Sequence, residues 1–219
     1  GPEGSLYTKS LRTAKAEALY FLSGVGVETY HSSFTYYGFR YSEISADRPV
    51  TIHGLRGLVV TSVMRDTGRI ETSDESVNRL YSNIRWGQYS NYLSIPTDCP
   101  QRNEREGWTG DTQVFAVTAS YNADSKAFLT KWMADMRDAQ RDEPGAPLDG
   151  AYPDMAPGYG YMGELGWADA GIIVPYQVYK MYGDTDIIEE NYASMQKYID
   201  VYLAKSEKKG GGRHYGDWL

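Results

Sequence analysis

The densest group of potentially reactive side chains in the sequence is the fourteen-residue segment 98–111, DCPQRNEREGWTGD, with four carboxylates, two arginines and a tryptophan. Glu104, Trp108 and Asp111 stand at i, i+4 and i+7, so a helix that began inside the segment would present them on one face. The two glycines of the segment favour an irregular turn equally well. In either arrangement a carboxylate can lie against an indole, and an apolar setting of that kind raises the pKa of a carboxyl group, as a general acid requires.

The alternative interpretation of this segment is a cluster of surface ion pairs, because charged loops are common and most exposed pairs contribute little. The residues alone leave both interpretations open. The three histidines and the single cysteine contain no pair at metal-ligand spacing, so we expect no metal site and no cofactor in this chain. We expect Cys99, which precedes a proline, to be a small buried residue.

The composition excludes some partners. The chain has 219 residues, of which 41% are hydrophobic and 23% charged, close to the average for globular proteins. A net charge of −7 argues against a nucleic-acid partner, because phosphate binding requires clustered Lys and Arg. No apolar run approaches the ~20 residues of a membrane span, so we expect no membrane partner. Twenty tyrosines and five tryptophans suit sugar faces and protein cores alike, and favour a carbohydrate ligand only weakly.

The rest of the chain must position the charged segment, and it divides into two regions whose apolar residues repeat with different periods. From Leu6 to about Arg65 the pattern is typical of antiparallel strands, with alternating aromatic residues over 30–36 and an apolar run over 58–63. The alternation changes phase near Gly38, as a turn or bulge would produce. We therefore expect a β portion at the N-terminal end.

A polar stretch, Asp66–Ser73, separates this portion from a predicted helical region. Ser73 or Asp74 can cap the first helix. Four later stretches repeat apolar residues at helical spacing: Phe115–Tyr121, Phe128–Met136, Ala170–Tyr182 and Ile187–Leu203. The long loop between them, Asp142–Leu165, contains Asp154 and Glu164, which we expect to be solvated loop charges or rim contacts.

The segment 98–111 closely resembles the signature of α-L-rhamnosidases of glycoside hydrolase family 78. The resemblance continues through most of the chain, in these stretches: Thr29–Tyr30, Phe34–Tyr41, Ser94–Thr97, Phe128–Trp132, Gly166–Ala170 with Pro175, and Tyr182–Asp184. One departure is Asn103, which stands where many members of the family have Asp. The resemblance implies a mainly α protein with an N-terminal β portion.

In detail, the resemblance implies that residues 1–68 are the C-terminal part of a β-sandwich domain. Residues 69–219 would then be the N-terminal part of an (α/α)6 catalytic barrel. About five helices are predicted here, whereas twelve helices of ordinary length need far more residues, so we expect the barrel to be incomplete in this chain.

The resemblance also implies hydrolysis of terminal α-L-rhamnosides with inversion, the partner being a rhamnose-containing carbohydrate or glycoside. Glu104 would be the general acid. Six residues would line the sugar subsite: Asp98, Arg102, Trp108, Asp111, Trp167 and Trp218. An inverting reaction also needs a general base, and the family's base, a Glu in the later half of the barrel, is expected beyond Leu219. The alternatives are another helical-barrel glycosidase, acting on a glucoside or glucuronide, and an inactive carbohydrate-binding fragment.

Overall fold

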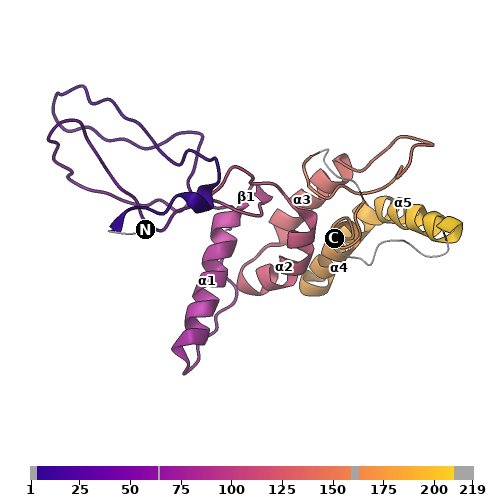
Figure 1. Ribbon diagram of the computed structural model, residues 1–219. Helices are drawn as coiled ribbons and strands as arrows, with labels where there is room; N and C mark the ends of the chain where they lie inside the picture. The colour runs from indigo at the N-terminus through magenta and orange to yellow at the C-terminus, as the bar shows by residue number, and fades with distance from the viewer. Residues whose placement is uncertain (1–3, 64, 159–162, 210–219) are drawn as a thin grey trace.

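The computed structural model describes residues 4–63, 65–158 and 163–209, with side chains described as far as Ala204. The chain divides visibly into long N-terminal loops and a group of helices, and α1 projects away from the other helices (Figure 1). The protein is mainly α, as expected. Trp218, one of the predicted sugar contacts, lies outside the described residues.

The N-terminal region differs from the prediction. Over residues 4–63 the described backbone contains the 3-10 turn η2 (Lys9–Leu11) and no strand, although antiparallel strands were expected. The backbone is largely extended, but its large apolar side chains, such as Phe21 and Val25, are mostly exposed. Paired strands need a buried face to be stable, and none of the described residues covers these side chains, which explains the missing ladder.

The helical region begins where the polar stretch ends. Helix α1 (Glu75–Asn91) is capped by Asp74, whose side chain accepts a hydrogen bond from the backbone N–H of Ser76 at 2.7 Å. Two short antiparallel strands follow, β1 (Tyr92–Leu93) and β2 (Ile95–Pro96). The charged segment 98–111 follows this tight reversal.

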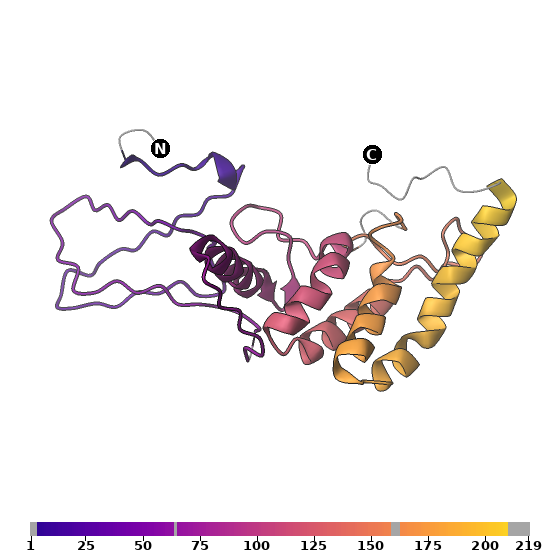
Figure 2. The same ribbon diagram turned by 90° about the horizontal axis from the view of Figure 1, so that it is seen from below.

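Four further helices complete the described structure: α2 (Thr109–Asn122), α3 (Lys126–Asp138), α4 (Ala170–Tyr182) and α5 (Asp186–Lys209). All four predicted helical stretches are confirmed. Helix α4 contacts α2, α3 and α5, and it reverses into α5 through a tight turn (Figure 2). Gly183 makes this turn with φ of 67°, a conformation that favours glycine. No helix in the described ranges is both long and apolar enough to cross a membrane.

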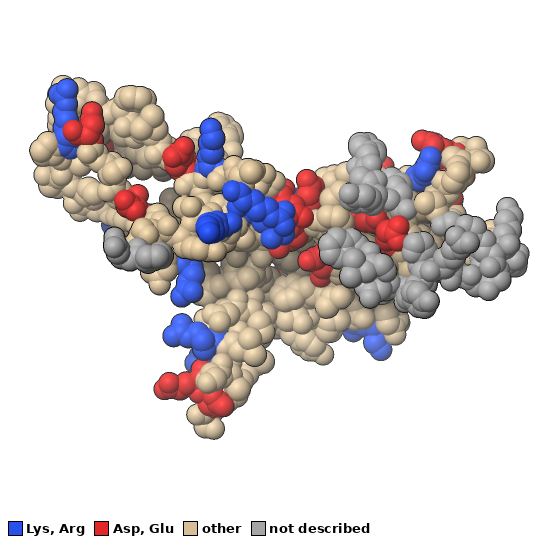
Figure 3. Space-filling model, viewed as in Figure 1, with Lys and Arg blue, Asp and Glu red and all other residues tan. Residues whose placement is uncertain are grey.

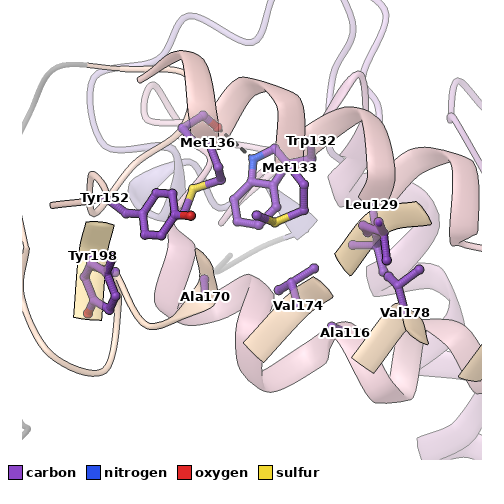
Figure 4. Packing of buried hydrophobic residues seen from close by; sticks show 13 residues of the cluster. Ala116, Leu129, Trp132, Met133, Met136, Tyr152, Ala170, Val174, Val178 and Tyr198 are labelled. Carbon is purple, nitrogen blue, oxygen red and sulfur yellow. Dashed lines mark hydrogen bonds between the residues drawn. The ribbon is translucent and has the colours of Figure 1, made fainter. Parts of the chain in front are cut away.

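The core lies between α2, α3, α4 and α5 and includes Leu129, Trp132, Met133, Val174 and Val178, all fully buried (Figure 4). The core also holds the long loop in place. The indole N–H of Trp132 donates to the carbonyl oxygen of Ala156 at 2.9 Å. Tyr152 lies directly over Gly171 of α4, where an added Cβ would be 2.1 Å from the tyrosine ring. The loop is therefore fixed against α3 and α4.

Candidate active site

The charged segment is a closed loop that leads into α2. The backbone N–H of Asp98 donates to the carbonyl oxygen of Glu106 at 3.0 Å, and the N–H of Glu106 donates to Asp98 Oδ1 at 2.9 Å. Helix α2 starts only at Thr109, with Trp108 as its N-cap residue. Of the two arrangements considered from the sequence, the irregular turn is the one that forms, and Glu104 lies outside the helix.

Four of the predicted residues form one bonded cluster. The Nε of Arg102 donates to Glu104 Oε2 at 2.9 Å, and an Nη of Arg102 donates to Asp98 Oδ2 at 3.0 Å. The indole N–H of Trp108 donates to Glu104 Oε1 at 3.1 Å. The side chain of Asp98 is 6% exposed and that of Glu104 22% exposed. The carboxylates are thus held in fixed orientations at a partly buried surface.

The pKa of Glu104 is shifted in the direction opposite to the sequence expectation. Partial desolvation acts to raise this pKa. The indole hydrogen bond from Trp108 and the positive charges of Arg102 and Arg12 together outweigh desolvation, so that the pKa lies below its ordinary value. The indole acts here as a hydrogen-bond donor to the carboxylate more than as an apolar surface, and these contacts favour the ionised form of Glu104.

Asp111 lies in the first turn of α2, close to the same cluster. Its side chain is exposed, yet its pKa is raised, first by desolvation from surrounding protein atoms and then by the negative charges of Asp98 and Glu104. When carboxylates lie close together, their mutual repulsion disfavours the state in which all of them are ionised. Asp111 is therefore electrostatically part of the site that the sequence predicted.

Trp167 lies between the long loop and α4, and it approaches the site from there. It packs on the first turn of α2, where a Cβ added to Gly110 would lie 2.9 Å from the indole. A side chain at position 110 would thus displace the tryptophan. The backbone on either side of Trp108 is bonded to the same loop, because Thr109 N–H donates to Asp154 O and Ala156 N–H donates to Gly107 O, both at 2.9 Å. The structure therefore places two tryptophans near one end of α2.

Two further residues lie near the site, of which sequence reasoning missed Arg12 and named Asp154 only as a solvated loop charge or rim contact. Arg12, from the N-terminal region, donates to Glu104 Oε2 at 2.8 Å across 92 positions of sequence, and no local pattern signals such a contact. Asp154 is 2% exposed, and so the expectation of a solvated loop charge is wrong for this residue. Burial raises the pKa of Asp154 to about 6, and the nearby Glu164 charge adds to the rise. Its burial depends on how the loop packs on the helices.

The cluster does not suit a metal ion. Asp98, Cys99 and Glu104 each place one possible ligand atom within 4.8 Å of the others. The guanidinium of Arg102 already bonds both carboxylates and supplies the positive charge that a cation would provide. Cys99 is buried as expected, and burial raises the pKa of its thiol and so disfavours the thiolate that binds metals. A separate open hollow in the described surface is lined by Lys126 and other residues. None of these residues belongs to the charged segment 98–111.

Known protein families match both the N-terminal region and the helical region of the chain. The family described as bacterial alpha-L-rhamnosidase 6 hairpin glycosidase domain matches residues 65–219, and the bacterial alpha-L-rhamnosidase concanavalin-like domain matches residues 1–73. An alpha-L-rhamnosidase of Streptomyces avermitilis is 43% identical over the whole chain, and one of Formosa agariphila is 38% identical over the whole chain. The chain spans only 21% and 24% of the lengths of these two relatives.

Solved structures give the same assignment. The structure of the S. avermitilis alpha-L-rhamnosidase complexed with L-rhamnose matches 67% of this chain and 14% of its own, with 45% identity and a TM-score of 0.61. The alfa-L-rhamnosidase of Aspergillus terreus matches 90% of this chain and 23% of its own, with 38% identity and a TM-score of 0.80. The helical region, the charged segment and these matches agree, and the chain belongs to the bacterial α-L-rhamnosidase six-hairpin glycosidase family.

Proposed function

We propose that this sequence works as part of an α-L-rhamnosidase that removes terminal α-L-rhamnose from glycosides or polysaccharides by an inverting acid/base mechanism. The observation that carries the proposal is the bonded cluster of Asp98, Arg102, Glu104 and Trp108. It lies in a chain whose relatives include the S. avermitilis enzyme solved with L-rhamnose. The cluster combines a carboxyl group that can transfer a proton with polar groups and an indole suited to a sugar ring.

In this mechanism Glu104 is the general acid. Its carboxyl group takes a proton from solvent and gives it to the glycosidic oxygen as the bond to the anomeric carbon breaks. A water molecule attacks that carbon from the opposite face and loses a proton to a general base. We place this base beyond Leu219, because no Glu after Asp111 lies in a segment that matches the family's base. The two carboxyl groups would stand about 6.5–9.5 Å apart to admit the water.

The remaining predicted residues bind the sugar. Asp98, Arg102 and Asp111 would hydrogen-bond its hydroxyl groups, since carboxylates accept and guanidinium groups donate such bonds. Trp108 and Trp167 would pack against the ring or its methyl group, and Trp218 would add a further aromatic wall. In the whole enzyme these residues would line one side of an (α/α)6 barrel. That barrel would begin near residue 69, after a β-sandwich domain to which residues 1–68 contribute.

A substrate panel tests this proposal. The 219-residue chain and a longer chain that extends through a complete barrel are each incubated with 4-nitrophenyl α-L-rhamnoside, β-D-glucoside and β-D-glucuronide, and nitrophenol release is measured. We expect the longer chain to cleave the rhamnoside selectively. Preferential cleavage of the glucoside or glucuronide would favour another helical-barrel glycosidase. A longer chain that binds L-rhamnose and cleaves none of the three would instead indicate a carbohydrate-binding protein.

The same assay tests where the base lies. We expect the 219-residue chain to release no nitrophenol at a useful rate, because it supplies the acid without the base. Comparable activity in the shorter and longer chains would show that the base is already present before Leu219. The anomer first released from the longer chain, followed by proton NMR, tests inversion independently of which carboxylate acts as the base.

A further inference from the structure

The N-terminal region contacts the charged segment at Glu104 and at the residues on either side of it. Three of these contacts join side chains: Arg12 to Glu104 at 2.8 Å, Asn103 to Thr13 at 2.6 Å, and the Arg105 guanidinium over the Tyr36 ring at 4.0 Å. Acidic and basic surfaces lie side by side where the N-terminal loops meet the helical region (Figure 3). The region ahead of the glycosidase domain therefore takes part in the environment of Glu104.

The contact of Arg12 constrains the protonation state of Glu104. Glu104 Oε2 accepts bonds from both Arg12 and Arg102, and Oε1 accepts the bond from Trp108. Arginine and the indole N–H are donors with no acceptor atom. Each carboxylate oxygen has two lone-pair sites, so the two arginine bonds fill Oε2 whereas Oε1 keeps one site free. A proton can therefore occupy Oε2 only after Arg12 or Arg102 has released it.

Of the three donors, Arg12 is the one that can withdraw most easily. Its side chain is 58% exposed, whereas that of Arg102 is 28% exposed and also bonded to Asp98. Trp108 is half-buried at the N-cap of α2. Arg12 also combines φ of 57° with ψ of −112°, a positive-φ conformation that non-glycine residues seldom adopt and that tends to occur at functional positions.

We propose that Arg12 is a positioning residue for Glu104: its guanidinium holds the resting carboxylate and leaves Oε2 when that oxygen takes up the proton for the leaving group. The inference rests on the proposed role of Glu104 as the acid. Among the described residues, the other charged or titratable groups facing this site are Arg102, Asp98, Asp111 and Cys99. A substitution at Arg12 changes none of these four residues.

The direct test is carbon-13 NMR titration of the Glu104 carboxyl in the 219-residue chain, which needs no turnover. Removal of a nearby positive charge disfavours the carboxylate, so Arg12→Gln should raise the pKa of Glu104, whereas Arg12→Lys should largely preserve it. Arg65→Gln is the matched control, because it removes an exposed arginine paired with Asp124, away from the motif. Circular dichroism checks that each variant is folded.

A kinetic measurement on the longer chain adds a functional readout. A general acid must be protonated, so its pKa sets the alkaline limb of kcat/KM. Arg12→Gln should move this limb to higher pH and raise kcat/KM above the limb by up to about fivefold, the factor that corresponds to an exposed ion pair of about 1 kcal/mol. If Arg12→Gln changed neither the pKa of Glu104 measured by NMR nor the pH of the alkaline limb of kcat/KM, the inference would be overturned. Failure of Glu104 as the acid would appear separately, as unchanged kinetics of Glu104→Gln.

Discussion

Asp154 provides a quantitative prediction about stability. This carboxyl group is 2% exposed, and burial raises its pKa from an ordinary value of 3.8 to about 6. The folded protein therefore binds a proton more tightly than the unfolded chain does between about pH 4 and 6. Over that range the free energy of unfolding should fall as pH rises. A pKa difference of about 2 corresponds to about 3 kcal/mol, all of which is lost by pH 7.

The substitution Asp154→Asn should remove this loss. Asn keeps the Oδ1 atom that accepts the backbone N–H of Glu164 at 2.9 Å, and it carries no charge at any pH. The variant should match the parent chain near pH 4 and exceed its free energy of unfolding at pH 7 by up to about 3 kcal/mol. Both chains carry the same other titratable groups. The contributions of those groups therefore cancel in the difference between the two free energies of unfolding.

Urea unfolding followed by circular dichroism at pH 4, 5, 6 and 7 measures both chains. Asp47→Asn is a suitable control, because Asp47 lies exposed in the N-terminal region and should show no comparable gain. If the parent and Asp154→Asn chains keep the same separation in free energy from pH 4 to pH 7, Asp154 is not a buried carboxyl of raised pKa. The packing of the loop on α2 and α4 would then have to be reconsidered.

Two further predictions concern packing around the site. Trp132→Ala removes a fully buried indole and its bond to Ala156, and should lower the free energy of unfolding by about 3–5 kcal/mol in urea titrations; a loss below about 1 kcal/mol would contradict its central place in the core. Gly107→Ala places a Cβ 2.1 Å from the carbonyl oxygen of Ala156 and should cost about 1–3 kcal/mol by the same assay. Gly57→Ala, where a Cβ meets nothing within 4 Å, is the control, and equal effects at the two glycines would refute the predicted clash.

The helical part of the fold was predictable because its signals are local. Apolar residues at helical spacing, the Asp74 cap and the Gly183 stop each act within a few residues, and the predicted stretch Ala170–Tyr182 coincides with α4. The N-terminal alternation suggested antiparallel strands, which the described residues 4–63 do not form. It could not predict a strand ladder, because a ladder also depends on which partner strands and covering side chains are near.

The grouping of four candidate site residues was predictable from the sequence, whereas the electrostatics of the site were not. The cluster around Glu104 and Trp108 comes from one short segment, so nearness along the chain is enough to group its residues. The lowered pKa of Glu104 depends partly on Arg12, which is distant in sequence. The raised pKa of Asp154 depends on loop burial. Both shifts arise from tertiary contacts that a local pattern does not encode.

The central claim, that Glu104 protonates the leaving group, is tested most directly by Glu104→Gln in the longer chain on two substrates. Methyl α-L-rhamnoside has a poor leaving group that needs a proton, whereas 4-nitrophenyl α-L-rhamnoside departs without one. Glu71→Gln, which removes an exposed carboxylate paired with Arg69 outside the motif, is the control. We predict that Glu104→Gln lowers kcat/KM on the methyl glycoside by about 10²–10⁴-fold and much less on the aryl glycoside. Equal losses on both substrates would contradict the role of Glu104 as the general acid.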